Sequence, residues 1–224
     1  LDPGELGVFE SAFAKLDGKS NQRVTVLPAP KPKSLEYVKD KFKGKRLSEQ
    51  QLQEIIQDIV SNGFSEVETT YFVLSCTSHP LNDAETIGLT KAMVNVGHQL
   101  DFRDDQHQVI VDKHCVGGVP GNRTTMLVVP IAAAAGLRIP KSSSRSITSP
   151  SGTADTMEAL ANVGVSMDQM HHIVKKTNGC IVWGGALDLS PADDIIINVE
   201  HTLELDSEGQ MIASILSKKK SVGS

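Results

Sequence analysis

A helix-start signal recurs three times between residues 48 and 85, and it constrains the fold more than any other feature of the sequence. Residues 48–51 read Ser-x-x-Gln, residues 65–68 read Ser-x-x-Glu, and residues 82–85 read Asn-x-x-Glu. In such a capping box, the two side chains satisfy backbone N–H groups that a helix leaves unpaired at its start. The sequence therefore predicts three successive helices, and Ser34 can begin another before them.

The helix after the first box has the clearest apolar face. Its apolar residues follow the spacing i, i+3, i+4, i+7 and i+8, which places them on one side: Leu52, Ile55, Ile56, Ile59 and Val60. We predict a helical domain over residues 34–103. The alternating prolines of residues 28–33 favour extended backbone and predict a semi-rigid linker. Residues 1–27, with the strand-like piece 23–27, then read as the remnant of an N-terminal domain.

After residue 103 the pattern changes from helices alone to alternating strands and helices. Strands are predicted at 109–111 and 137–139, and helices at 124–135 and 153–162. This alternation is typical of a parallel sheet with helices packed on it. Further on, we predict a helix from Ser166, strands at 180–183 and 195–199, and a helix at 210–219. The fold class is therefore α/β plus all-α, with 104–161 as the first part of the α/β domain.

The predicted strand 109–111 leads into Asp112-Lys113-His114 and a glycine-rich bend, and a helix follows. Glycines let backbone N–H groups converge on an oxyanion, and the start of a helix adds positive potential. Lys113 could supply a full positive charge. The glycines alone would fit an ordinary turn, but with Lys113 beside them we predict a phosphate site.

Residues 142–153 form a second polar segment between a predicted strand and a helix, with many hydroxyls and Arg145. Hydroxyl and guanidinium groups suit phosphate oxygens, and α/β sheets bind ligands at such a place. The alternative is a solvated serine-rich loop.

Composition excludes several classes of protein. The 224 residues carry a formal net charge of -5, which does not favour bulk binding to nucleic acid or anionic membrane. No apolar run reaches the roughly 18 residues of a membrane span. The cysteines at 76, 115 and 180 lie far apart, which fits a reduced, cytoplasmic protein without a disulfide framework or zinc site. His171 and His172 are adjacent on a predicted helix, so their rings point apart and do not chelate one metal.

The two ends of the chain suggest a fragment of a longer protein. The sequence starts at Leu1, not at Met, and residues 218–224 follow a helical pattern without a closing element. The alternative is a disordered tail on a complete protein.

Six motifs occur in an order that resembles a known family. They are residues 112–122, 143–149, 151–155, 182–186, 191–194 and 213–219. They resemble the thymidine/pyrimidine-nucleoside phosphorylases, type 2 branch, close to the archaeal AMP phosphorylases. The resemblance implies a helical domain and a mostly parallel α/β phosphate-binding domain of the nucleoside phosphorylase/phosphoribosyltransferase type. It also implies that residues 162–193 return to the helical domain, and that 194–224 continue a truncated α/β domain.

The resemblance assigns phosphate and substrate contacts residue by residue. Lys113 matches the phosphate-binding lysine, whereas Cys115 stands where the family has serine, a better hydrogen-bonding partner. The positions that hold the phosphate-bearing substrate in the AMP branch match Gly118, Ser144, Arg145, Ser146, Ile147, Thr148, Ser149 and Thr153.

The catalytic and base-contacting positions also match. Asp206 matches the proton donor, and His114 matches a histidine that lines the nucleoside site. Ser214 and Lys218 match residues that contact the base. Val199 stands where the thymidine enzymes carry an arginine that grips the pyrimidine, which leans away from standard thymidine recognition.

The implied enzyme is a pentosyltransferase. Phosphate attacks the anomeric carbon of a (deoxy)nucleoside, and the products are a free base and (deoxy)ribose 1-phosphate. Protonation of the leaving base is typically worth about 10²–10⁴-fold in rate. The scheme implies inorganic phosphate as co-substrate, no cofactor and no metal. It implies a homodimer or higher homo-oligomer, without nucleic acid or membrane as partner.

Three other functions stay open at this point. One is an AMP or nucleoside-monophosphate phosphorylase that yields ribose 1,5-bisphosphate. Another is a phosphoribosyltransferase on the same fold, which uses pyrophosphate in place of phosphate. The last is a non-catalytic nucleotide-binding protein, which Cys115 and Val199 would favour.

Overall fold

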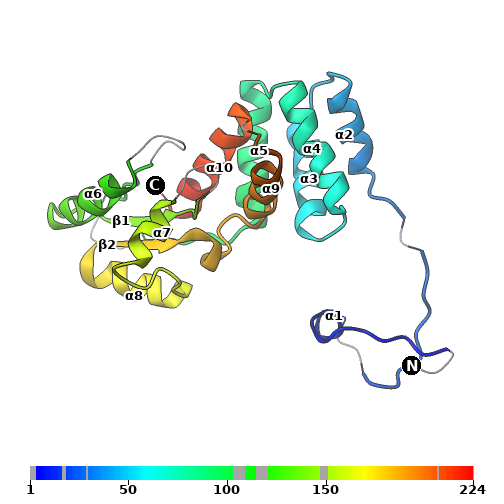
Figure 1. Ribbon diagram of the computed structural model, residues 1–224, viewed down its shortest axis with the longest axis horizontal. Helices are drawn as coiled ribbons and strands as arrows, with labels where there is room; N and C mark the ends of the chain where they lie inside the picture. Colours follow the sequence, from blue (N-terminus) through cyan, green and yellow to red (C-terminus); the bar gives the residue numbers. More distant parts are fainter. Residues whose placement is uncertain are drawn as a thin grey trace. The chain divides into compact units, whose positions relative to one another are not determined.

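The computed structural model describes residues 4–16, 19–28, 30–102, 109–114, 121–146, 151–205 and 207–223. The chain divides into two compact units, Leu1–Pro30 and Lys31–Ser224, with the boundary inside the predicted linker. In the first unit, the described residues contain the short helix α1 (Glu10–Lys15), which we did not predict (Figure 1). Residues 23–27 form no strand, so that expectation is wrong.

The second unit starts with a bundle of helices, and all three predicted capping boxes form at their starts. Ser34 is the first residue of its helix and does not cap it; its hydroxyl donates a hydrogen bond to Asp58 of the next helix instead. The helices are α2 (Ser34–Phe42), α3 (Glu49–Val60), α4 (Glu66–Ser78) and α5 (Asp83–Val96).

The core of the bundle contains the apolar face predicted for α3, with Leu52, Ile55, Ile56 and Ile59 all buried. Helices α9 (Pro191–Leu203) and α10 (Glu208–Ser221) pack on the same bundle. The predicted strand at 195–199 is therefore wrong, because these residues lie within α9. Proline at the first helical position and acidic residues in the first turn favour a helix start there.

An ion pair inside the bundle joins α2 to α5. Lys41 Nζ lies 2.8 Å from Glu85 Oε1, and the two side chains are 0% and 1% exposed. Glu85 also accepts hydrogen bonds from the Leu47 N–H and from Arg46. Burial would raise the pKa of Glu85, but these bonds lower it below its ordinary value, so the carboxylate stays charged.

The α/β part contains two strands, β1 (Ile139–Ser143) and β2 (Gly179–Trp183), which pair in parallel. Ile139 lies opposite Gly179, and the register continues to Ser143 opposite Trp183. The predicted strand at 109–111 is reduced to one parallel bridge between Ile110 and Arg138. Strand β1 starts at the end of the predicted range 137–139 and runs into the serine-rich segment.

Helices cover the strands: α6 (Asn122–Ala134), α7 (Thr153–Glu158) and α8 (Met167–Thr177), while the short 3-10 helix η1 (Gly184–Leu187) follows β2. Figure 1 shows α6 and α8 on opposite sides of the strands. This follows from strand geometry, in which alternate residues face opposite sides. Gly179 packs next to Val129 and Ala133 of α6, whereas Val182 packs in a cluster with Met170 of α8. Helix α7 ends earlier than the predicted range 153–162.

The chain returns to the helical bundle at α9, later than predicted. Residues 162–193 were expected in the helical domain, but β2 pairs with β1, and α8 packs on both strands. Residues 194–224 were expected in the α/β domain; α9 and α10 contact the bundle helices, and Lys219 of α10 also pairs with Asp112 of the α/β part. The backbone hydrogen bonds between β1 and β2 decide this placement, because buried N–H and C=O groups have to be paired.

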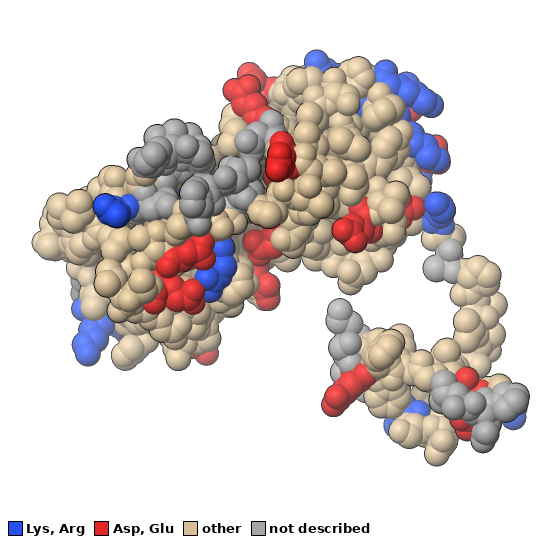
Figure 2. Space-filling view, in the orientation of Figure 1, with Lys and Arg blue, Asp and Glu red and all other residues tan. Residues whose placement is uncertain are grey.

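Among the residues that the structure describes, no helix combines the length and apolar character needed to span a membrane. On the face shown in Figure 2, acidic and basic side chains are mixed in small groups among other residues. This distribution agrees with the modest net charge of -5.

Candidate active site

Three parallel segments end at one edge of the small sheet, and the predicted site residues follow them. The segment that pairs at Ile110 leads to Lys113 and His114, and β1 leads to residues 144–146. This carboxyl edge is where open α/β sheets bind ligands. Six of the predicted residues lie outside the described residues: Cys115, Gly118, Ile147, Thr148, Ser149 and Asp206.

Asp112 connects this edge to helix α10. Its Oδ2 lies 2.8 Å from Lys219 Nζ, and its Oδ1 lies 3.8 Å from Nζ of the buried Lys141 in β1. Asp112 also accepts a hydrogen bond from the Lys113 N–H at 2.7 Å. Asp112 was not among the predicted site residues, although it begins the first of the six motifs.

Lys113 reaches toward the start of α6. Its Nζ donates to the hydroxyl of the buried Thr125, at 3.0 Å, in the first turn of that helix. An ammonium group beside a helix N-terminus forms a strongly anion-attracting place. Phosphate binding at this place stays a prediction.

His114 stays neutral at physiological pH. Packing around its ring, followed by the positive charges of Lys141 and Lys219, lowers its pKa to about 4, although part of the residue is exposed. A neutral imidazole can donate one hydrogen bond and accept another, but it carries no extra proton to give to a leaving group.

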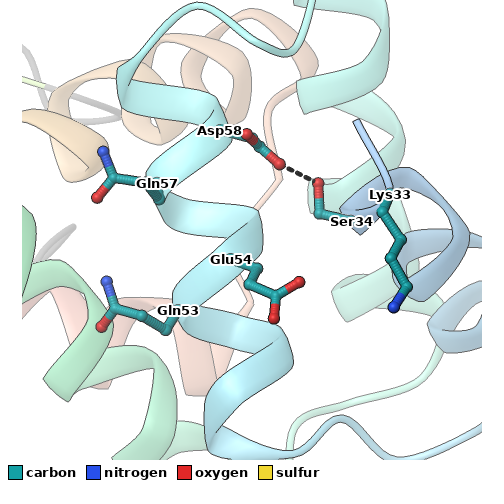
Figure 3. Close-up of a pocket in the computed structure, with 6 residues that line it drawn as sticks. All are labelled: Lys33, Ser34, Gln53, Glu54, Gln57 and Asp58. Carbon is teal, nitrogen blue, oxygen red and sulfur yellow. Dashed lines mark hydrogen bonds between the residues drawn. The ribbon is translucent and has the colours of Figure 1, made fainter. Parts of the chain in front are cut away.

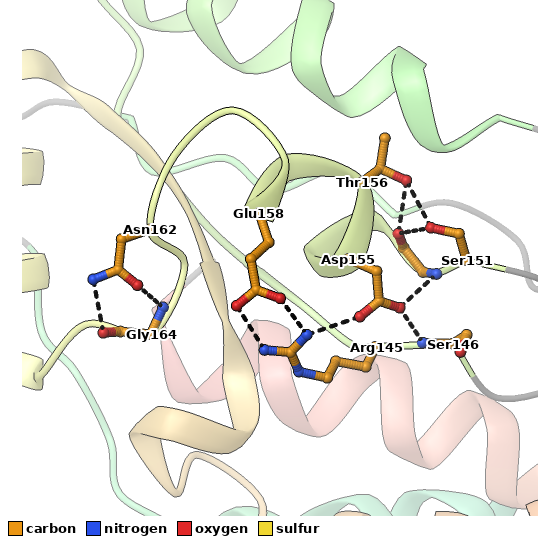
Figure 4. A network of polar contacts seen from close by, with 9 residues as sticks. Arg145, Ser146, Ser151, Asp155, Thr156, Glu158, Asn162 and Gly164 are labelled. Atoms are coloured by element: carbon orange, nitrogen blue, oxygen red, sulfur yellow. Dashed lines mark hydrogen bonds and ion pairs between the residues drawn. The ribbon is translucent and has the colours of Figure 1, made fainter.

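Arg145 is held by carboxylates in the structure. Its guanidinium lies 2.9 Å from Asp155 Oδ1 and donates two hydrogen bonds to Glu158, at 2.7 and 2.9 Å (Figure 4). It also lies over the Trp183 ring, 4.7 Å from its centre. Direct contact between Arg145 and phosphate stays a prediction, and it would require this arrangement to open.

Asp155 holds the serine-rich segment at both ends. Its Oδ2 accepts hydrogen bonds from the N–H groups of Ser146, at 2.8 Å, and Gly152, at 2.9 Å (Figure 4). Burial would raise the pKa of Asp155, but these two bonds and the contact with Arg145 lower it. Thr153 follows as the first residue of α7, and the Ser144 carbonyl accepts a bond from the Ala154 N–H. Residue types alone gave no reason to select Asp155 as a site residue.

Helix α10 presents Ser214 and Lys218 one turn apart, both half-buried. A different stripe of α10, which includes Ala213 and Ser217, is fully buried. Lys218 forms an ion pair with Asp193 in the first turn of α9. Burial would lower the pKa of Lys218, but Asp193 raises it above the ordinary value.

Two further residues of α9 bear on the predicted site. Burial raises the pKa of Asp194 to about 6, with Asp193 and Asp188 adding to the rise and Lys218 opposing it. Val199 is 7% exposed and belongs to the core of the helical bundle. Its apolar side chain therefore contributes packing.

An open pocket lies elsewhere, where the start of α2 meets α3 (Figure 3). Ser34 and Asp58, which line it, are already hydrogen-bonded to each other. None of the residues predicted to bind phosphate or substrate lines this pocket, so it is separate from the sheet edge. Across the described ranges, no group of three or more His, Cys, Asp or Glu side chains could hold a metal ion.

Comparison with known families identifies both parts of the second unit. Residues 35–97 match the helical bundle domain of a glycosyl transferase family, and residues 107–215 match its a/b domain. The two ranges together cover more than half of the chain. The chain belongs to this glycosyl transferase family.

Curated relatives of this chain confirm the resemblance to thymidine phosphorylases that was drawn from the motifs. The chain is 50% identical over 224 residues to "Putative thymidine phosphorylase 1" of Acidovorax sp. (strain JS42), covering 100% of this chain and 43% of the relative. It is 51% identical over 224 residues to "Putative thymidine phosphorylase" of Legionella pneumophila (strain Paris), again covering 100% and 43%. The chain thus spans less than half the length of these curated relatives.

A solved structure confirms the fold class. The crystal structure of anthranilate phosphoribosyltransferase from Thermus thermophilus aligns with a TM-score of 0.65 at 19% identity. The alignment covers 82% of this chain and 54% of that chain. At this identity the likeness concerns the fold alone, a helical bundle with an α/β part.

Proposed function

We propose that the chain is part of a pyrimidine-nucleoside phosphorylase, with thymidine among its substrates. The observation that carries the proposal is the Asp112–Lys219 ion pair, which joins the sheet edge to helix α10. It supports a single site in which Lys113 lies on the phosphate side and Lys218 on the base side. The relatives that are 50% and 51% identical to this chain are named as putative thymidine phosphorylases, which supports the same reaction class.

In the proposed reaction, an oxygen of phosphate attacks the anomeric carbon while the bond to the base breaks. The base takes the bonding electron pair and then a proton, so charge and atoms balance. Lys113 and the N-terminus of α6 would hold phosphate, because both favour negative charge. Positioning phosphate near the anomeric carbon converts a bimolecular step into an intramolecular one.

Burial and the neighbouring lysines lower the pKa of His114 to about 4, which favours a proton donor other than His114. Asp206 stays the proposed donor by family resemblance. His114 would instead donate or accept a hydrogen bond with the nucleoside. Ser214 and Lys218 would contact the base from α10.

A second candidate is phosphorolysis of a nucleoside 5'-monophosphate such as AMP. The observation that favours it is the segment 146–152, whose two ends are held by Asp155 at the start of α7. Its hydroxyls and backbone N–H groups would suit a second phosphate. We also propose a homodimer or higher homo-oligomer, which light scattering of the full-length protein would test.

The test is release of free base by the full-length protein from thymidine, uridine, cytidine and AMP, with and without phosphate. Lys113→Gln should raise the KM for phosphate, whereas Lys220→Gln, at an exposed position of α10, should not. No release from any substrate, under conditions in which an established thymidine phosphorylase works, would contradict the proposal. Nucleotide formation from phosphoribosyl pyrophosphate and a base would indicate a phosphoribosyltransferase instead.

A further inference from the structure

Two of the six motifs meet at a buried contact between α9 and α10. Asp193 comes from the motif 191–194 and Lys218 from the motif 213–219, and their side chains form an ion pair. Figure 1 shows α10 between α5 and the α/β part, and Lys219 of the same helix pairs with Asp112 at the sheet edge. The contact therefore lies next to the proposed base site.

Asp193 has no freedom to turn toward solvent. Its side chain is 1% exposed, and its backbone N–H donates to the Ser190 carbonyl at the start of α9. The neighbouring Ala192 and Ile196 are in the bundle core, which fixes the first turn of the helix. The carboxylate thus has a position set by the packing of α9.

Lys218 depends on that carboxylate for its charge. Its side chain is 15% exposed, and an ammonium group so far removed from water tends to lose its proton unless an opposite charge lies close by. Two acidic groups act on Lys218: Asp193, which is in direct contact with it, and Asp194. Asp188 in turn acts on Asp194.

Building on the proposed function, we infer that Asp193 is a positioning residue, which keeps Lys218 protonated and aims its ammonium group at the leaving base. A base that departs gains negative charge on its ring atoms. An ammonium group already fixed in place stabilises that charge without reorganising during the reaction. Ser214, one turn earlier on α10, would help to orient the same base.

The first experiment measures steady-state kinetics of the full-length Asp193→Asn variant. We expect kcat/KM for the nucleoside to fall about 100-fold, as for loss of one preorganised charge, with the KM for phosphate changed less than about twofold. On the alkaline limb of the pH profile, Asp193→Asn should lose its activity at a lower pH than the wild-type protein does. The reason is that Lys218 would lose its proton at a lower pH without the carboxylate. Asp193→Glu should restore part of the activity, because it keeps the charge.

The matched control is Asp168→Asn, which removes an exposed aspartate from the first turn of α8. It should leave kcat/KM and the pH profile unchanged. An equal fall in both aspartate variants, or a loss confined to the KM for phosphate, would overturn the inference.

A second measurement does not depend on activity. The reactivity of Lys218 toward an amine-modifying reagent is followed against pH by mass spectrometry, in the wild-type protein and in Asp193→Asn. We expect its titration midpoint to shift down by at least about one pH unit, a tenfold change in proton affinity. An unchanged midpoint would refute the role of Asp193, whereas a shifted midpoint in a protein without any phosphorolysis would refute only the proposed function.

If Asp193→Asn fails to fold, the double variant Asp193→Asn/Lys218→Gln distinguishes a folding defect from loss of the positioning role, because it leaves no lone buried charge. The inference predicts that the double variant folds and remains about as slow as Lys218→Gln alone. A double variant that regains wild-type activity would overturn it.

Discussion

Replacing Glu85 by glutamine should destabilise the helical bundle strongly, because Glu85 is a buried carboxylate shared by several donors. It accepts from Lys41 Nζ at 2.8 Å, from Arg46 at 2.8 Å, and from the N–H groups of Leu47 and Asn82 at 2.9 and 3.0 Å. The amide keeps the shape of the side chain but removes its charge. Lys41, which is 0% exposed, then lacks its counter-charge.

The magnitude follows from this burial. Removing one partner of a buried ion pair typically costs about 3–5 kcal/mol, because the other charge is left in a dry environment. Lys41→Met should cost less, about 1–3 kcal/mol, since Glu85 keeps Arg46 and its backbone donors. The double variant Glu85→Gln/Lys41→Met should be more stable than Glu85→Gln alone, because no lone charge stays buried.

The measurement is the free energy of unfolding in urea at pH 7, followed by far-UV circular dichroism. Glu49→Gln is the control, because it breaks the Lys91–Glu49 pair, whose side chains are 54% and 60% exposed. Such surface pairs contribute about 0–1 kcal/mol. If Glu85→Gln costs less than about 1 kcal/mol, or if the two single effects simply add in the double variant, the reasoning is wrong.

The remaining predictions concern pH, the serine-rich segment and one close backbone contact. The ring protons of His114 should titrate near pH 4 in NMR spectra, not near 6.5, and stability should fall as the pH drops between these values because the unfolded chain binds the proton first. Asp155→Asn should raise the KM for a phosphate-bearing nucleotide about 10–100-fold in the full-length protein, because Ser146 and Gly152 lose the carboxylate that holds their N–H groups, and an unchanged KM would count against that role. Gly97→Ala should lower the unfolding free energy by about 1–3 kcal/mol, because its methyl group would overlap the Leu189 carbonyl, whereas Gly164→Ala should have little effect in the same urea titration.

The helix starts are the part of the fold that sequence reasoning predicted best. The three predicted boxes form with the expected hydrogen bonds, at Ser48, Ser65 and Asn82, and the helix predicted from Ser166 starts with the same pair of hydrogen bonds. Each involves residues three positions apart, so the information is local. Strand β2 was also predicted closely, from a short apolar run that leads into glycines.

Segments whose apolar pattern fits either a strand or a helix were not predictable in this way. Residues 195–199 contain adjacent β-branched residues, yet they are helical, because Ile196 and Val199 fill the bundle core from α9. A short apolar run has no period long enough to separate the two structures. The return of the chain to the bundle at α9 likewise depends on the pairing of β2 with β1.

For the site, too, local sequence patterns predicted some features, and only the tertiary structure decided the others. Residue types pointed to Lys113 as a charge for an anion, whereas Lys218 was assigned to the base only by the family resemblance. Neither prediction needed knowledge of the neighbouring side chains. The partners of such charges come from distant parts of the chain: Asp112 and Lys219 are 107 positions apart. Only the tertiary structure placed Asp193 against Lys218 and paired Arg145 with two carboxylates. The reason is that burial and long-range contacts decide which side chains stay charged and which partners they face.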